Sequence, residues 1–307
     1  MANQKHHAAP TNDGWTTLFE EYVRHDDIDK ALDILTNLAS SSPAAPASYK
    51  FRALEIIDNH LPDPNQARVW LHHLLDSHSP SVRDLGALLA ENLVPLIYPH
   101  SPQEVVEILT RIADDQNWEV RESAGHVFSQ LLKSVPADAF PLLEQWVSHP
   151  SENLRRAAVI TIKKVAKERR PEWGVQLLDL IEPLLSDHSI YVRKNLGAFA
   201  IGDGLLRYYP ELTLERLRIW ATWVDEQVRW SVAMVFSAAE GAKHMDEAIN
   251  ILDRLARDER RYVWRAVASA MRSLGRRSPE RIMPVLKRWL EDPTRSSPAQ
   301  VALKYLT

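Results

Sequence analysis

The stretch L-S-D-H-S-I-Y-V-R-K-N-L-G, residues 185–197, contains the pattern that decides the fold of this chain. It holds a short polar turn, after which an aliphatic residue and a basic one, Val192-Arg193, open an apolar run. Similar aliphatic–basic pairs recur at Val82-Arg83, Val120-Arg121, Leu154-Arg155 and Val228-Arg229, with a variant at Val263-Trp264-Arg265. Successive pairs are 34 to 38 residues apart. A fixed period of this length predicts a solenoid, in which each repeat buries its apolar face only against its neighbours.

Each repeat is expected to consist of a helix A, a tight polar turn and a helix B. Apolar residues at spacings of three and four, such as Leu154, Ala158, Thr161 and Val165, predict the B helices. Ser, Asp and Asn in the turns can cap the helix that follows, and Pro can end the helix before. The A helices are predicted at residues 66–76, 103–114, 137–148, 174–185, 214–224, 246–257 and 279–290.

The two ends of the chain complete the expected fold. Residues 15–38 and 49–61 are predicted as a divergent first helix pair, joined by a linker at 40–48, and 297–306 as a truncated last helix. Residues 1–13 are expected to be a disordered tail, and 14–307 a single domain. The predicted fold is all-α: a right-handed superhelical solenoid of about seven to eight HEAT-like helix pairs, with the B helices on its concave side.

Composition excludes several classes of protein. The chain has no cysteine, which excludes disulfides, thiolate metal sites and cysteine nucleophiles. Residues 1–10 do not resemble a signal peptide, and no apolar run reaches the length of a membrane span. The sequence contains no H-E-x-x-H spacing, no phosphate-binding glycine loop and no G-x-S-x-G motif. We therefore expect a cytoplasmic monomer with no membrane association, no metal site and no cofactor.

The net charge of −4 hides an asymmetry along the chain. Residues 1–153 carry 10 Lys and Arg against 22 Asp and Glu, a net charge of −12, so 14–153 is the acidic half of the expected domain. Residues 154–307 carry 27 against 19, a net charge of +8, and form the basic half. A basic half of this kind indicates a polyanionic partner. The alternative is that its arginine-rich helices are neutralised by neighbouring acids.

The B helix that begins near Leu154 carries four cations on one face. Arg156, Lys163, Lys167 and Arg170 lie within about 60° of one another around an α-helix. Such a face repels itself unless an anion binds, and phosphate groups suit it. The alternative is an ordinary solvated basic face.

Equivalent positions on the B helices change from acidic to basic and aromatic along the chain. These positions are Glu122, Arg156, Lys194, Trp230 and Arg265. Trp118 precedes Glu122 by one helical turn, and Glu119 stands beside it. A tryptophan and a carboxylate so placed could stabilise a cationic group, such as an alkylated base or a glycosyl cation. The alternative is a helix-start aromatic next to an acid that the helix dipole favours.

Two further features concern the helix interiors. Trp146, Trp220, Trp223 and Trp289 occur late in A helices, and we expect them in the core between repeats rather than in a base-stacking platform. The sequence Gly202-Asp203-Gly204 interrupts an apolar stripe. Because glycine weakens a helix and a buried carboxylate needs a partner, we expect either a kink there or a partner for Asp203, such as Arg207.

Three stretches resemble the HEAT-like DNA alkylation repair glycosylases of the AlkC and AlkD types. They are N-W-E-V-R-E-S-A (117–124), W-V-S-H-P-S-E-N-L-R-R-A-A (146–158) and the stretch at 185–197. The resemblance implies a protein that holds the backbone of damaged duplex DNA in its concave groove and excises N-alkylated purines. By position it implies backbone contacts at Arg155, Arg156, Arg193 and Lys194. With the basic stripe and the other repeats, the candidate DNA contacts are Arg121, Arg155, Arg156, Lys163, Lys167, Arg193, Lys194, Arg229 and Arg265.

The resemblance also implies roles for aromatic and acidic residues. Trp118 and Glu122 match the Trp/acid pair of the AlkD type. The candidate catalytic groups are accordingly Glu122 and Glu119, and the candidate base-stacking groups are Trp118 and Trp230.

The chain departs from the family at the expected catalytic positions. Ile160 stands where the AlkC type has a catalytic Glu, Ala198 stands where the AlkD type has an aromatic residue, and Glu122 replaces an Asp. An alternative from another class is a protein–protein interaction scaffold without catalytic activity, whose acidic and basic halves grip a partner polypeptide.

Overall fold

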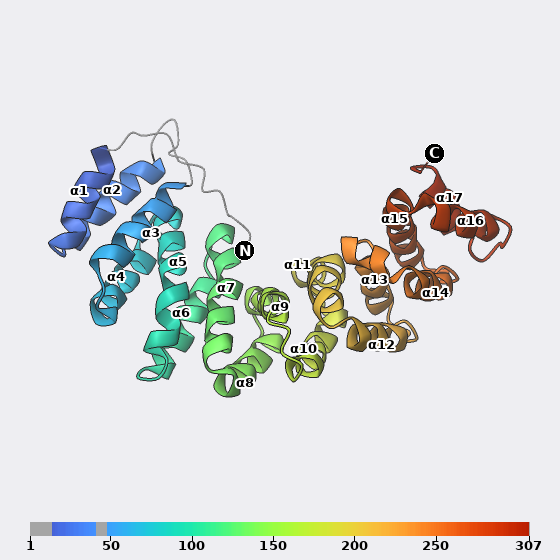
Figure 1. Cartoon of the computed structure of the whole chain (residues 1–307), viewed down its shortest axis with the longest axis horizontal. Helices are drawn as coiled ribbons and strands as arrows, with labels where there is room; N and C mark the ends of the chain where they lie inside the picture. The colour runs from blue at the N-terminus through green and yellow to red at the C-terminus, as the bar shows by residue number, and fades with distance from the viewer. Residues whose placement is uncertain (1–13, 41–47, 307) are drawn as a thin grey trace. The chain divides into compact units, whose positions relative to one another are not determined.

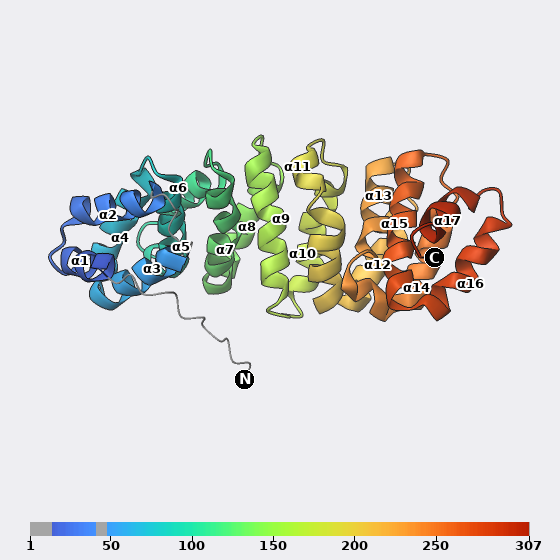
Figure 2. The ribbon, with the colours of Figure 1, turned by 90° about the horizontal axis from the view of Figure 1, so that it is seen from above.

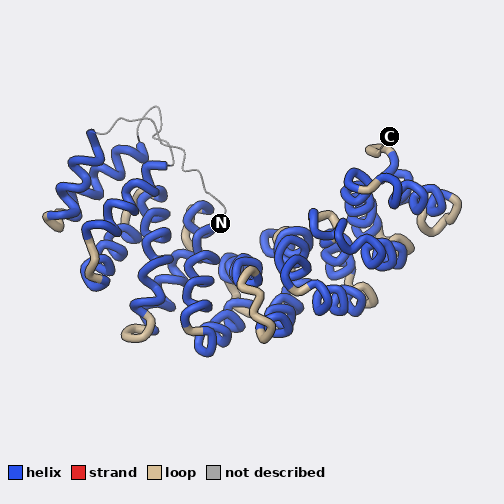
Figure 3. Tube along the Cα trace, viewed as in Figure 1, coloured by secondary structure: helices blue, strands red, loops and turns tan. Residues whose placement is uncertain are grey.

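The computed structural model describes residues 14–40 and 48–306 of the chain. Every regular element among these residues is a helix, and no strand occurs among them (Figure 3). The prediction of an all-α fold is confirmed. The tail expected at 1–13 lies outside the described residues, as do residues 41–47 of the linker. Within the described ranges, no helix has the length and apolar character needed to cross a membrane.

The chain divides into two compact units, Met1–Val135 (unit 1) and Pro136–Thr307 (unit 2). The boundary falls between two helices, α7 (Trp118–Ser134) and α8 (Pro136–Val147). It therefore precedes the change from acidic to basic composition at residue 154. The single domain expected over 14–307 stays a prediction.

The described part of unit 1 contains seven α-helices (Figure 1). They are α1 (Gly14–Arg24), α2 (Ile28–Ser40), α3 (Ser48–His60), α4 (Pro64–Asp76), α5 (Pro80–Ile97), α6 (Pro102–Ala113) and α7. The long helix α5 packs against α4, α6 and α7, so α4/α5 and α6/α7 form two A/B pairs. The A helices predicted at 66–76 and 103–114 correspond to α4 and α6.

The helix expected at 15–38 is two helices, and this detail of the prediction is wrong. The chain turns between α1 and α2, where Asp26 has a left-handed φ of 57°. The carboxylate of Asp26 accepts a hydrogen bond of 2.7 Å from the indole N–H of the buried Trp70. A left-handed conformation is unfavourable for most residues but is tolerated by aspartate, and here the hydrogen bond helps to hold it. The break between α1 and α2 therefore depends on Trp70, which is 44 positions from Asp26.

Unit 2 consists of A helices and B helices that alternate along the chain (Figures 1 and 2). The A helices are α8, α10 (Trp173–Ile181), α12 (Pro210–Trp220), α14 (Met245–Leu255) and α16 (Pro279–Leu290). The B helices are α9 (Glu152–Ala166), α11 (Ile190–Arg193) with η2 (Leu196–Leu206), α13 (Glu226–Val235), α15 (Arg261–Arg277) and α17 (Ser296–Leu303). The short 3₁₀ helices η1 (Glu182–Ser186) and η3 (Ala239–His244) complete the unit. Consecutive B helices pack on one another from α9 to α17 and form the B-helix layer, while each contacts its A partner.

Side-chain caps determine where four of the B helices begin. Asn117, Ser151, Ser189 and Asp225 precede α7, α9, α11 and α13, and each side-chain oxygen accepts the backbone N–H two residues on. The expectation that polar turn residues cap these helices is confirmed. Each of these helices consequently begins at the same point of the repeat, which brings the aliphatic–basic pair into its first turn.

The tryptophans near the ends of A helices belong to the core. Trp146, Trp220 and Trp289 are at most 2% exposed. The indole N–H of Trp220 donates to Glu182 at 2.7 Å, and that of Trp289 donates to Asp253 at 2.8 Å. A buried indole needs such a partner. The prediction of core tryptophans is confirmed for these three, whereas Trp223 is half-buried.

The interruption around Asp203 is a change of helix type. Residues Leu196–Leu206 form a π-helix, η2, which follows the single turn of α11. Gly202 lies against α13 so closely that an added Cβ would be 2.7 Å from the Cβ of Ala238 and 2.8 Å from the carbonyl oxygen of Val235. The glycine therefore lets η2 and the next repeat approach, and short π-helical segments occur often at functional sites.

Candidate nucleic-acid interface

The arginine of the Leu154-Arg155 pair points into its repeat. Arg155 is 5% exposed, and its NH1 group donates to the carbonyl oxygens of His149 and Pro150, both at 2.8 Å, in the turn before α9. Its Nε and NH2 groups donate to the two carboxylate oxygens of Asp187, at 2.6 and 3.1 Å, in the turn of the next repeat. Arg155 thus joins two consecutive turns. This guanidinium is already bound inside the protein, and the DNA contact expected at Arg155 stays a prediction.

The same arrangement recurs in other repeats. In unit 1, Arg83 donates from Nε and NH2 to Asp115, at 2.7 and 2.9 Å. In unit 2, Arg229 donates from NH1 to Asp258 at 2.7 Å. Both arginines, like Arg121, also donate to backbone carbonyls of the turn before their own helix. These arginines organise the turns, and the DNA contacts expected at Arg229 and Arg121 stay predictions.

Arg193 occupies the equivalent position on α11 and has different surroundings. The residue is half-buried, and its Nε atom is buried with no hydrogen-bond partner in the described part of the chain. Its charge acts on the hydroxyl of Tyr262, although burial is the larger effect and raises the pKa of that group. Among the described residues, Arg193 therefore does not join two turns as Arg155 does.

Cations of two consecutive repeats meet at one aromatic ring. Arg156 follows Arg155 and is rotated from it by about 100° around α9, so it leaves the turn and faces the next helix. Its guanidinium carbon lies 4.8 Å from the centroid of the Tyr191 ring on α11. The Nζ atom of Lys194 lies 4.9 Å from the same centroid. The structure therefore brings together two residues that the sequence assigns to separate repeats.

Other cations of the predicted basic stripe also lie next to aromatic rings. The Nζ atom of Lys163 on α9 is 3.4 Å from the centroid of the Phe199 ring in η2. The guanidinium carbon of Arg170 is 4.4 Å from the centroid of the Trp173 ring. Lys167, the remaining member of the stripe, is exposed. All four cations of the stripe thus reach the surface of unit 2.

Tyr191 and Phe199 are candidate site residues that the sequence analysis does not identify. The available signal is the spacing: Tyr191 precedes Lys194 by three residues, one helical turn. For Phe199 no such signal exists, because its contact with Lys163 depends on the π-helical geometry of η2.

The B-helix layer also carries a stacked aromatic pair. The rings of Trp230 on α13 and Tyr262 on α15 have centroids 5.6 Å apart and planes 9° apart. The Tyr262 hydroxyl donates to Oε1 of Gln227 at 2.8 Å, which fixes the orientation of the ring. Tyr262 is 42% exposed, and Arg265 is exposed one turn later on α15. The base-stacking candidate Trp230 is therefore part of a flat aromatic surface with a cation on the neighbouring turn.

The candidate Trp/acid pair lies at the start of α7, in unit 1. Trp118 is the first residue of this helix and is 63% exposed. Asn117 caps the helix by accepting the backbone N–H of Glu119 at 2.8 Å. Glu122 follows one turn later and is half-buried. The helix thus places an exposed indole and two acidic side chains near its N-terminal end.

Asp203 lies in η2 and is half-buried. In the described ranges it forms no ion pair or side-chain hydrogen bond. Arg207, the partner considered from the sequence, instead has its guanidinium carbon 5.7 Å from the centroid of the Tyr208 ring. The glycine-flanked aspartate is therefore explained by the change of helix type and not by an ion pair.

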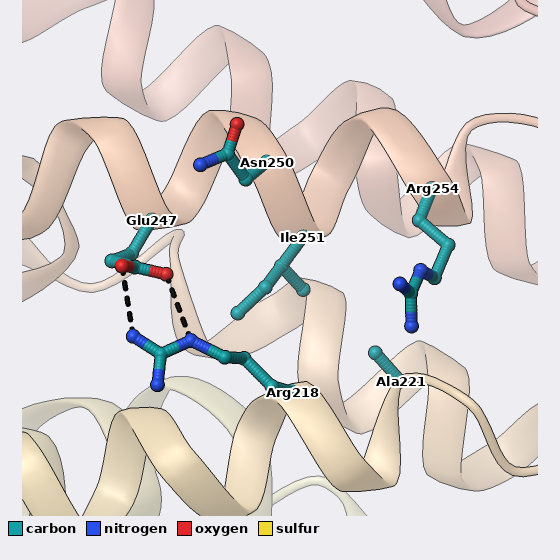
Figure 4. Close-up of a pocket in the computed structure, with 6 residues that line it drawn as sticks. All are labelled: Arg218, Ala221, Glu247, Asn250, Ile251 and Arg254. Atoms are coloured by element: carbon teal, nitrogen blue, oxygen red, sulfur yellow. Dashed lines mark hydrogen bonds and ion pairs between the residues drawn. The ribbon is translucent and has the colours of Figure 1, made fainter.

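The A helices of unit 2 present a pocket of about 440 Å³ between α12 and α14 (Figure 4). Arg218 and Glu247 form a two-bond ion pair across it, with N–O distances of 3.1 and 2.8 Å, and Ile251 lies in its floor. Arg254, at the other end, is exposed. The pocket belongs to the A helices and contains none of the cations described above. Among residues 14–40 and 48–306, no three His, Asp or Glu side chains are grouped so as to hold a metal ion.

Comparison with known proteins gives a family match. Residues 53–201 match the family model described as "DNA alkylation repair enzyme". No curated protein matches the chain. The matched residues include Trp118, Arg156 and Lys194, and exclude Trp230 and Arg265.

Several solved structures are similar to the chain. The protein smu.31 from Streptococcus mutans UA159 is 17% identical, with 94% of this chain and 100% of that chain covered and a TM-score of 0.31. AlkD2 from Streptococcus mutans is 16% identical, with 95% and 99% covered and a TM-score of 0.33. The Kap95:Nup1 complex contains a chain that is 13% identical, with 95% of this chain and 42% of that chain covered and a TM-score of 0.48.

Proposed function

Since residues 53–201 match the family model described as "DNA alkylation repair enzyme", we propose that this chain binds DNA and that unit 2 holds the phosphate backbone along its B-helix layer. The contacts in this proposal are the cations that face away from the turns. They are Arg156, Lys163, Lys167, Lys194 and Arg265. Arg193, which occupies the position of Arg155 but pairs with no acid that the structure describes, is included with them.

The proposal is carried by a difference between two classes of cation in unit 2. Arg155 and Arg229 are paired with aspartates that are 3–4% exposed in their side chains. By contrast, Lys167, Lys194 and Arg265 form no ion pair with any residue that the structure describes. The alternative of a self-neutralised basic half therefore fits the first class and does not fit the second. Like charges on one layer repel, and a bound polyanion relieves that repulsion.

Fluorescence anisotropy with a labelled DNA duplex over a series of salt concentrations tests the proposal. We expect binding whose logarithmic affinity falls linearly with the logarithm of salt concentration, because each neutralised phosphate releases counterions. Absence of salt-sensitive binding would contradict the proposal. A polypeptide partner that stays bound after nuclease treatment, in a chain that binds no DNA, would instead favour a protein-interaction scaffold.

We also propose Glu122, with Glu119 as the alternative carboxylate, as the group that supports excision of N-alkylated purines. The support is the family match over this helix and the exposed indole of Trp118 one turn before Glu122. A carboxylate stabilises the positive charge that develops on the sugar, and an indole face attracts a cationic base.

Release of 3- or 7-methylpurine from alkylated DNA tests this assignment. We expect release by the unmodified chain and its loss in Glu122→Gln, with Glu119→Gln as the paired variant. Unchanged release in both variants would contradict the assignment. No release by the unmodified chain would contradict excision and would leave the DNA-binding proposal standing.

A further inference from the structure

Two groups of aromatic side chains in unit 2 have different surroundings. Near the ends of A helices, Trp146, Trp220 and Trp289 are buried. Five others, on the B helices and directly after η2, are half-buried or exposed: Tyr191, Phe199, Tyr208, Trp230 and Tyr262. Packing of the core explains the first group. It leaves the exposed surface of the second group unexplained.

A cation accompanies three of these five rings. Arg156 and Lys194 lie over Tyr191, and Lys163 lies over Phe199. The guanidinium carbons of Arg169 and Arg207 lie 5.2 and 5.7 Å from the centroid of Tyr208. Positive charges on α9 and α11 and after α9 and η2 therefore lie beside the rings of Tyr191, Phe199 and Tyr208.

The other two rings form a flat surface of their own. Trp230 and Tyr262 are nearly parallel and come from consecutive B helices. The hydrogen bond from Tyr262 to Gln227 holds the pair in this orientation before any ligand arrives. An oriented ring pair that is part exposed can extend its stack by one more flat group.

Rings and cations in alternation suit a nucleic-acid strand whose bases are unpaired. A duplex hides the faces of its bases inside the stack and offers the protein mainly its phosphates and base edges. An unpaired strand exposes both its phosphates and its base faces, and proteins bind such strands by combining basic grooves with aromatic stacking. Cations alone would suffice for a duplex, so the exposed rings point to unpaired bases.

When a strand binds, we expect replacement of a cation–ring contact by a base–ring contact to be favourable. A cation over an exposed ring contributes little, because water solvates the cation well. Stacking of a base on an aromatic ring is the stronger contact. Arrival of a strand would therefore move the exposed Lys194 from the ring of Tyr191 to a phosphate, while a base takes the ring face.

We propose that the B-helix layer of unit 2 preferentially binds DNA with unpaired bases, through stacking on Tyr191, Phe199 and the Trp230–Tyr262 pair. This inference rests on the proposed DNA binding and names the form of DNA that the surface takes. It is separable from that function, because a surface that held only phosphates would still bind DNA.

Three labelled probes of about 12 nucleotides, within the site sizes of single-strand-binding surfaces, test the inference by anisotropy on the full chain. They are an oligothymidine strand, an abasic strand of equal length and charge, and a duplex of equal length. We expect the oligothymidine strand to bind about ten-fold more tightly than the abasic strand, because only the former offers bases for stacking. We also expect it to bind more tightly than the duplex.

Variants at Tyr262 test whether stacking on the Trp230–Tyr262 pair causes the preference for unpaired bases. Tyr262→Leu keeps apolar bulk and removes the flat ring, and we expect it to weaken oligothymidine binding by about five- to ten-fold and to leave abasic-strand binding unchanged. Tyr262→Phe keeps the ring and should restore binding. Ile219→Ala, which changes a 48% exposed apolar residue on the A helix α12, should change neither affinity.

The outcomes separate this inference from the proposed function. Equal binding of the abasic and oligothymidine strands, preference for the duplex, or equal losses for both strands in Tyr262→Leu would overturn the inference while DNA binding stands. Failure of all three probes to bind would overturn both. Circular dichroism of each variant checks that the helices are intact.

Discussion

Arg155 and Asp187 form an ion pair of two hydrogen bonds whose side chains are 6% and 4% exposed. The two residues are 32 positions apart and belong to consecutive repeats. The same spacing separates Arg83 and Asp115 in unit 1. The aliphatic–basic pair therefore connects consecutive repeats. Its aliphatic residue is buried in the core, and its arginine binds an aspartate in the turn of the next repeat.

Loss of one partner of this pair should destabilise the fold. We expect Asp187→Ala to lower the free energy of unfolding by about 3–5 kcal/mol, because it leaves the Arg155 guanidinium buried without its counter-charge. Unfolding in urea, followed by circular dichroism, measures the loss. The control is Asp246→Ala, since the side chain of Asp246 is 85% exposed in its pair with Arg281 and its loss should cost at most about 1 kcal/mol. Equal small losses in both variants would contradict a structural role for the buried pair.

Low pH should weaken the ion pairs that Asp258 forms with Arg229 and Arg260. Burial raises the pKa of Asp258, but hydrogen bonds from Arg260 and Arg229 outweigh burial and hold this pKa well below its ordinary value. Such a carboxylate contributes its full stability above the unfolded-state pKa of about 4 and loses it as the pH falls from there through the folded-state pKa. We expect the Tm difference between the unmodified chain and Asp258→Asn to shrink as the pH falls from about 5 to about 2. A difference that stays constant over this range would show that the charge of Asp258 contributes nothing.

The two glycines around Asp203 should respond differently to an added methyl group. In Gly202→Ala the new Cβ would lie 2.8 Å from a backbone oxygen, so we expect a loss of about 1–3 kcal/mol from overpacking. In Gly204→Ala the nearest atom is Cγ of the flexible Lys163 side chain at 3.1 Å, and we expect a change within about 1 kcal/mol. Thermal unfolding of the two variants compares them. A larger loss at Gly204 would contradict the packing described for η2.

The repeat architecture can be predicted from the sequence because the patterns that indicate it are local. Apolar spacing and the caps at Ser151 and Ser189 lie within a few residues of the helices that they define, and the expected last A helix, 279–290, agrees with α16. The break at Asp26 is not readable, because the left-handed turn is held by Trp70, 44 residues away. Contacts between distant segments determine such details.

The candidate site could be predicted only in part, because contacts with residues distant in the sequence also determine it. Arg155 and Arg156 are adjacent and chemically identical, so both are expected from the sequence to contact DNA. The structure separates them, because Arg155 meets Asp187 while Arg156 lies over Tyr191. The recurrence of an aspartate 32 residues after Arg83 and Arg155 was the signal that could have distinguished them.

The salt dependence of DNA binding in matched charge variants shows whether the B-helix layer of unit 2 holds the DNA backbone. Lys194→Gln and Arg265→Gln each remove one unpaired cation from the B-helix layer, and Arg254→Gln removes an exposed arginine from the A helix α14. We expect each B-helix variant to weaken duplex binding and to lower the slope of log affinity against log salt by about one, and Arg254→Gln to leave the slope unchanged. Equal effects in all three variants, or no effect in the B-helix variants, would contradict the assignment of DNA binding to this layer.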